Sequence, residues 1–114
     1  MGTSGNRPIA SYADFWLYYL QEHARPATRN LHYFGTAAAT LGALAAVALS
    51  DLWLALAALV AGYGPAWIAH FFIEKNRPAT FTYPLWSLVS DFRMAWFWAT
   101  GRLTAELARA GVGR

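Results

Sequence analysis

Residues 36–72 read TAAATLGALAAVALSDLWLALAALVAGYGPAWIAHFF, and this stretch decides the fold. Asp51 is the only side chain in it with a formal charge, and it lies in the middle of the run. A helix needs about 20 apolar residues to cross a bilayer, so the run and its flanks hold two crossings. Ser50 and Asp51 form a short polar break, and a turn that tight makes the two crossings antiparallel. The stretch therefore predicts a transmembrane helical hairpin with helices over 28–49 and 52–74.

The composition of the whole chain also indicates a membrane protein. Of its 114 residues, 57% are hydrophobic and 13% are charged, which is too apolar for an ordinary soluble domain of this size. This length predicts a single domain over 1–114. The absence of cysteine excludes disulfides and thiolate metal ligands. The formal net charge of +3 is small, and the arginines stand beside apolar segments, so we expect the chain to meet membrane lipid and no nucleic acid.

Shorter helices are expected on both sides of the hairpin. Residues 1–10 have no periodicity and are predicted to be a flexible tail, whereas aromatic residues recur at helical spacing over 11–23 and predict an interfacial helix. Pro84 opens a predicted third membrane-associated helix over 84–101. Charged residues in its middle require that it either lies at the membrane interface or turns its charged face into the protein.

The fold class that follows is an all-α integral membrane protein. An antiparallel transmembrane hairpin is flanked by an N-terminal interfacial helix and a C-terminal amphipathic or membrane-embedded helix. Arg25 and Arg29 precede the first crossing, and Lys75 and Arg77 follow the second, while Asp51 lies at the turn. Because cytoplasmic flanks carry an excess of Lys and Arg, both ends of the hairpin are expected to face the cytoplasm.

The chain has three histidines, and the hairpin brings them to one level. His32 lies about 19 residues before the turn and His70 about 19 to 20 after it, so at about 1.5 Å per residue they share nearly the same depth. The helix over 11–23 ends with His23. Glu74 follows His70 by four residues and shares its helix face. We expect these four side chains to meet at the cytoplasmic mouth of the hairpin, where such a set suits zinc or iron.

Motifs along about residues 11 to 104 are similar to those of a known family. They are Tyr12-Ala13-Asp14-Phe15-Trp16, Glu22-His23, Asn30-Leu31-His32, Gly62-Tyr63-Gly64, His70-Phe71-Phe72, Glu74-Lys75-Asn76-Arg77-Pro78-Ala79-Thr80-Phe81 and Pro84-Leu85-Trp86-Ser87-Leu88. The chain resembles bacterial members of the 2-hydroxy fatty acid dioxygenase family, small membrane proteins related to a yeast endoplasmic reticulum enzyme. The run from His70 to Phe81 is the most specific part of the match.

The resemblance implies an Fe(II)-dependent enzyme of the bacterial inner membrane. With O2 as co-substrate it would shorten a 2-hydroxy fatty acid by one carbon, a step of fatty acid α-oxidation linked to breakdown of a sphingoid base. The resemblance carries the important histidines of the family over to His23, His32 and His70.

Further residues are candidates from their level in the membrane. Arg29, Lys75 and Arg77 stand where a substrate carboxylate would lie, and arginine can bind it through two parallel hydrogen bonds. Asn76 and Asp91 are expected to accept hydrogen bonds from the ligating histidines.

Two other functions stay open on the sequence. A zinc-dependent membrane hydrolase could use the same ligands, with Glu74 as the general base. A non-enzymatic membrane protein that binds lipid or scaffolds a partner could use the histidines for structure alone. The sequence also leaves room for a homo-oligomer. Dependence on oxygen and the identity of the metal would separate these functions.

Overall fold

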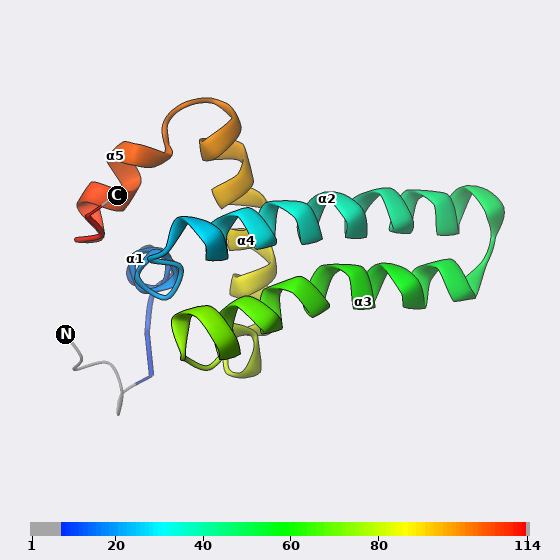
Figure 1. Ribbon diagram of the computed structural model, residues 1–114, viewed down its shortest axis with the longest axis horizontal. Coiled ribbons are helices and arrows are strands. Elements are labelled where there is room, and N and C mark those ends of the chain that lie inside the picture. Colours follow the sequence, from blue (N-terminus) through cyan, green and yellow to red (C-terminus); the bar gives the residue numbers. More distant parts are fainter. Residues whose placement is uncertain (1–7, 114) are drawn as a thin grey trace.

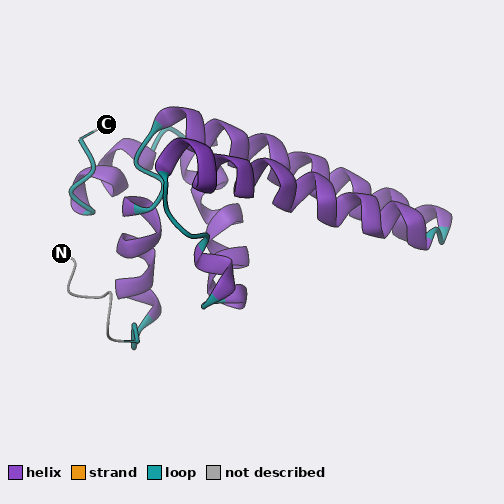
Figure 2. Cartoon of the chain, turned by 60° about the horizontal axis from the view of Figure 1, so that its bottom comes forward, coloured by secondary structure: helices purple, strands orange, loops and turns teal. Residues whose placement is uncertain are grey.

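A computed structural model describes residues 8–113 of the chain, so most of the predicted tail over 1–10 lies outside the described residues. Within this range the secondary structure is helical and contains no strand, which confirms the expected fold class. A long hairpin projects from one end of the molecule, and the shorter helices gather at the other end (Figures 1 and 2). The molecule measures 45 × 31 × 27 Å along its principal axes.

The hairpin consists of α2 (Pro26–Leu49), α3 (Leu52–Ile68) and a π-helical segment, η2 (Ala69–Glu74), that continues α3. The predicted turn is confirmed. Ser50 takes a left-handed conformation, and the Asp51 carboxylate accepts a hydrogen bond from the Trp53 backbone N–H at 2.9 Å. Helix α2 begins at Pro26, two residues before the expected start. Proline suits the first position of a helix because a backbone N–H there has no hydrogen-bond partner within the helix.

Small residues hold the two long helices close together. A Cβ atom built on Gly35 would lie 2.8 Å from the Gly62 carbonyl oxygen, and one built on Gly42 would lie 2.9 Å from the Ala58 Cβ. Any side chain at these positions would push α2 and α3 apart. The glycines therefore set the distance between the helices, and with it the distance between residues that the two helices carry.

The helices at the open end of the hairpin are α1 (Tyr12–Gln21), the 3-10 turn η3 (Ala79–Phe81), α4 (Pro84–Ala99) and α5 (Leu103–Arg109). Their core holds buried residues from all four elements, and the large ones lie in α1, α4 and α5: Phe15, Trp16, Tyr19, Leu20, Met94, Leu103 and Leu107. The aromatic face of α1 therefore packs inside the protein, where the sequence had placed it at a membrane surface. The helical periodicity of the aromatic residues predicts that this face is buried. Only the position of the neighbouring helices decides whether it is buried in the membrane or in the protein core.

Helix α4 crosses the hairpin near its open end (Figure 1). Ser87, Ser90 and Met94 on one side of it are buried. The opposite side leaves a stripe of large apolar side chains at least 48% exposed: Leu85, Leu88, Val89, Phe92 and Trp96. With 16 residues, α4 is about 24 Å long, and it is not among the helices that are long enough to cross a bilayer. It turns its polar side into the protein and its apolar side outward.

Within residues 8–113, two helices are long and apolar enough to cross a membrane, namely Pro26–Leu49 and Leu52–Glu74. Only 17% and 11% of their most apolar windows are buried inside the protein. A core helix of a soluble protein has the same composition but is mostly buried. The exposed apolar surface of this hairpin therefore fits association with a membrane.

Candidate metal centre

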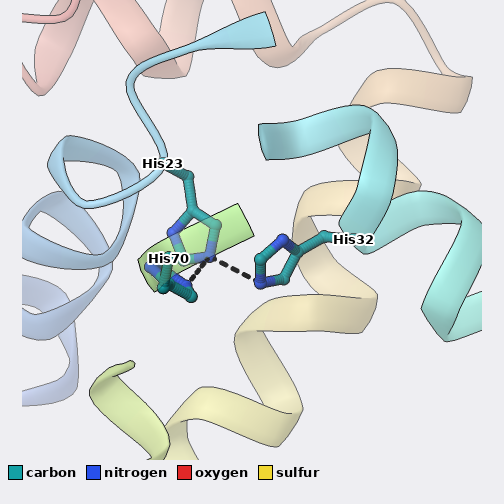
Figure 3. A group of neighbouring side chains, drawn as sticks. All are labelled: His23, His32 and His70. Carbon is teal, nitrogen blue, oxygen red and sulfur yellow. Dashed lines mark hydrogen bonds between the residues drawn. The ribbon is translucent and has the colours of Figure 1, made fainter. Parts of the chain in front are cut away.

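The three histidines meet at the open end of the hairpin, each carried by a different segment. His23 follows α1, His32 lies in α2 and His70 lies in η2, and their side chains are between 1% and 4% exposed. The Nε2 atom of His23 is 3.0 Å from His32 Nε2 and 3.1 Å from His70 Nε2 (Figure 3). The rings stand nearly perpendicular to one another, at 82° to 85°. Segments far apart in sequence thus direct three imidazole nitrogens at one point.

The opposite ring nitrogen of each histidine is held by an acceptor. His23 Nδ1 donates to the Tyr19 carbonyl oxygen at 2.6 Å, and His32 Nδ1 donates to the Thr28 carbonyl oxygen at 2.9 Å. His70 Nδ1 lies 2.7 Å from Asn76 Oδ1.

Carbonyl oxygens only accept, so the protons of His23 and His32 must reside on Nδ1. The Asn76 amide N–H donates to the Glu22 carbonyl, which leaves its oxygen to accept from His70. All three Nε2 atoms therefore present lone pairs.

Lone pairs at this spacing repel each other unless a cation lies among them. Burial, reinforced by the neighbouring His32 and His70, holds the pKa of His23 well below its usual range, so a proton does not fill that role at His23. Metal–nitrogen bonds of about 2.0–2.1 Å place two ligands of one ion about 2.9–3.4 Å apart, depending on the angle. The measured separations lie in this range. The donor set therefore fits a divalent metal, and the held Nδ1 atoms are typical of metal-ligating histidines.

Arg29 fixes the connection that carries His23. Its guanidinium is buried, and Nη1 donates to the His23 carbonyl oxygen at 2.8 Å and to the Ala24 carbonyl oxygen at 2.9 Å. The sequence analysis placed Arg29 at the substrate carboxylate. In the structure, hydrogen bonds to the chain between α1 and α2 engage it, so it positions a histidine.

Glu74 was expected beside the metal, and the structure directs it elsewhere. Its Oε2 accepts a hydrogen bond from the Arg25 backbone N–H at 2.7 Å. Arg25 caps the N-terminus of α2, where unpaired N–H groups attract an anion. Among the described residues, the group whose ligand atoms lie within 4.8 Å of one another contains the three histidines and not Glu74. Ligation by Glu74 therefore finds no support in this geometry.

Asp91 belongs to the site without contacting a histidine Nδ1. The Tyr19 hydroxyl donates to Asp91 Oδ1, and the Tyr19 ring stacks on His23 with their centroids 4.0 Å apart. The expectation that Asp91 orients a histidine is corrected, because other acceptors engage all three Nδ1 atoms. Asp91 and Ser87, one helical turn apart on α4, line the small cavity that the histidines also line.

A comparison with protein families identifies the chain. Residues 9–103 match the model of a family described as 2-hydroxy-palmitic acid dioxygenase Mpo1-like. The chain belongs to the Mpo1-like family. No curated protein and no solved structure gives a significant match. The match spans all three histidines, Asn76 and Asp91, so the whole candidate metal centre falls within the part of the chain that defines the family. The family's name implies dioxygenase activity.

Within this Mpo1-like site, sequence reasoning missed Tyr19, Thr28 and Ser87. Tyr19 and Thr28 each precede a histidine by four residues, the spacing at which a side chain reaches back to a carbonyl oxygen of its own helix. Ser87 precedes Asp91 by the same spacing. Lys75 and Arg77 are exposed, with the Arg77 guanidinium 5.3 Å from the centroid of the Phe81 ring. Their contact with substrate stays a prediction.

Proposed function

We propose that this protein is a membrane-inserted, Fe(II)-dependent dioxygenase that uses O2 to shorten 2-hydroxy fatty acids by one carbon. The observation that carries the proposal is the convergence of three buried Nε2 lone pairs whose Nδ1 atoms are all held. Fe(II) bound by His23, His32 and His70 would keep open coordination positions and supply oxygen activation. The family match supports the dioxygenase activity.

Residues of the chain would prepare the substrate head group. Ser87 Oγ is buried and has no hydrogen-bond partner among the described residues, so it can donate to a polar group of the substrate. The cavity beside it has a volume of about 10 Å³, room for about one water molecule, so a head group enters only when the side chains that line the cavity move apart. Asp91 faces the same cavity. Burial raises the pKa of Asp91 to about 7, against the opposing effect of the Tyr19 hydrogen bond, so its carboxyl group can exchange a proton near neutral pH. We assign Ser87 to the substrate carboxylate and Asp91 to the 2-hydroxyl proton.

The proposal also includes the bacterial inner membrane, with the metal centre at its cytoplasmic face. Exposed apolar side chains along the hairpin support insertion. Arg25, Lys75 and Arg77 lie at the open end and Asp51 lies at the turn, the distribution that the positive-inside rule predicts for a cytoplasmic open end. The exposed apolar stripe of α4 fits a helix lying along the membrane surface beside the histidines.

The structure gives less support to the alternative functions. The zinc hydrolase expected from the sequence used Glu74 as its general base, and Glu74 instead accepts a hydrogen bond from the Arg25 backbone N–H. A purely structural role for the histidines would leave three lone pairs facing one another in a buried site, which costs free energy without a cation.

Oxygen uptake by detergent-purified protein, loaded anaerobically with Fe(II), tests the proposal on addition of 2-hydroxyhexadecanoic acid. We expect uptake that depends on substrate, is absent with Zn(II), and disappears in His70→Ala together with tight metal binding. Glu74→Gln is the matched control and should keep the metal. Iron binding without oxygen uptake on any 2-hydroxy acid would overturn the activity. Equal metal content in wild type and His70→Ala would overturn the site.

A further inference from the structure

An apolar groove leads away from the histidines along the hairpin. A cavity of about 180 Å³ begins at His32 and Asp91 and is closed on one side by Leu88 and Phe92 of α4. A larger hollow of about 700 Å³ continues to the turn at Ser50. The two share the lining residues Ala39, Ala58, Leu59, Leu88 and Phe92. They therefore adjoin and form one groove, which starts between the hairpin and α4 and continues along the hairpin alone.

The chemistry of this groove changes sharply along its length. Its polar groups lie at the histidine end and at the turn, and alanine, leucine and valine side chains line most of the rest. Thr40 is an exception in its wall, but its hydroxyl already donates to the Thr36 carbonyl oxygen at 2.8 Å. A polar ligand would find no partners along this path. A ligand with a polar head at the histidines and an unbranched hydrocarbon chain along the apolar wall matches both the polar end and the apolar length of the groove.

The dimensions agree with a long chain. Ser50 lies 18 residues beyond His32 on α2 and its cap, which corresponds to about 27 Å of helix. The volume of the larger hollow, about 700 Å³, is in the range of known ligand sites, which is about 300–1,000 Å³. Farther along, the groove opens sideways, because Val47 in its wall is 80% exposed. This opening lies on the apolar surface of the hairpin, away from the charged residues at its open end.

We propose that this groove holds the alkyl chain of the substrate, which enters sideways from the bilayer with its polar head directed to the histidines. The inference rests on the proposed function for the identity of the head group. Leu88 and Phe92 form the wall that separates the bound chain from bulk lipid near the head. Ala43 and Val47, one helical turn apart on α2, set the space for the more distant part of the chain.

Photo-crosslinking of the full chain in lipid nanodiscs tests the groove directly and needs no turnover. The probes are two 2-hydroxyhexadecanoic acids, with a diazirine either near the head or at the far end of the chain. The head-proximal probe should label Thr36, Leu88 or Phe92, and the far probe should label Val47 or Leu52. Excess unlabelled 2-hydroxyhexadecanoic acid should compete with both probes. Labelling of outward-facing Leu41 and Ala48 to the same extent would show a lipid-covered surface and overturn the proposal.

Substitutions that fill the groove provide a second test. Ala43→Phe places a ring in the groove, whereas Ala48→Phe is the control on the same helix outside it. We expect Ala43→Phe to raise KM for 2-hydroxyhexadecanoic acid about tenfold, which corresponds to about 1.4 kcal/mol, because the ring takes up space that the alkyl chain would occupy. KM for 2-hydroxyoctanoic acid should stay unchanged. Val47→Trp lies one helical turn nearer the Ser50–Asp51 turn, so KM should rise only for acyl chains longer than those that Ala43→Phe affects.

The two proposals fail separately in these experiments. Position-specific crosslinking without oxygen uptake on any 2-hydroxy acid would keep the groove and reject the activity. Oxygen uptake whose KM in Ala43→Phe and Ala48→Phe is the same for all chain lengths would keep the activity and reject the groove.

Discussion

The base of the molecule and its arm are both helical, yet the arm, unlike the base, buries no large apolar side chain. In the base, formed by α1, η2, α4 and α5, Phe15 is fully buried and Tyr19 is 1% exposed. In the arm, residues 36–62 of the hairpin, Val47 is 80% exposed and Trp53 is 77% exposed. The base has a core of its own, whereas the arm depends on another medium to cover its surface. The candidate metal centre lies where the two regions join.

The largest expected difference between the regions concerns their apolar side chains. Phe15→Ala should lower the free energy of unfolding by about 3–5 kcal/mol, because it leaves a cavity in the core of the base. Val47→Ala in the arm should change it by less than about 0.5 kcal/mol in detergent, since this side chain contacts little protein. Chemical unfolding followed by circular dichroism measures both. A large loss in Val47→Ala would mean that the arm packs against protein.

At the junction, Asn76→Ala should weaken metal binding about 10- to 100-fold without unfolding the protein. The substitution removes the Asn76 Oδ1 acceptor, 2.7 Å from His70 Nδ1, that orients the His70 ring. Loss of the hydrogen-bond partner of a metal-ligating histidine lowers metal affinity by about 10- to 100-fold. Asn30→Ala, an exposed asparagine on α2, is the matched control. Isothermal titration with Fe(II) under anaerobic conditions gives the affinities. Equal affinities in the two variants would remove Asn76 from the metal centre.

Within the hairpin, Gly35→Ala should destabilise the protein by about 1–3 kcal/mol, because its Cβ would lie 2.8 Å from the Gly62 carbonyl oxygen. Gly64→Ala should be neutral or stabilising, since among the described residues no atom outside the adjacent helix backbone would lie within 4 Å of the added Cβ, and alanine favours a helix. Thermal unfolding of both variants in one detergent compares them. Similar melting temperatures would show that the two long helices separate at little cost.

The smallest expected effect is a dependence of stability on pH in the metal-free protein. The folded pKa of His23 is depressed by burial, so below about pH 6.5 the unfolded state binds a proton that the folded state excludes. His23 should therefore lower stability as pH decreases from 7 to 5, whereas the raised pKa of Asp91 acts in the opposite direction. In thermal scans over this range, His23→Gln should lose less stability, or gain more, than the wild type as pH decreases. An unchanged slope in the variant would mean that His23 takes up a proton in the folded state.

Much of the fold follows from short-range features of the sequence. The hairpin bounds agree with the structure to within two residues, and the Ser50–Asp51 turn and the start of α4 at Pro84 agree fully, because hydrophobic run length, capping residues and proline act locally. The convergence of His32 and His70 was also predictable, since helix rise places residues equally far from a turn at equal depth. Asn76 was expected to accept from a histidine, and the structure shows that hydrogen bond.

Other features required the packing of elements distant in sequence. The sequence identified Glu74 as acidic and one helical turn from His70, but its partner is the backbone N–H of Arg25, which only the approach of η2 to α2 makes available. Arg29 likewise turns to the carbonyl oxygens beside His23.

The sequence by itself determined which segments are helical, how long they are and which residues share a depth, because these properties depend on periodicity and helix rise. Only the tertiary structure decided that α1 packs its aromatic face against α4 and α5, that the histidines face one another through Nε2 with each Nδ1 held, and that a groove starts beside them between the hairpin and α4. Those features depend on which helix surfaces pack together and lose contact with solvent. The stabilisation comes from residues distant in sequence, so no local pattern in the sequence reports it.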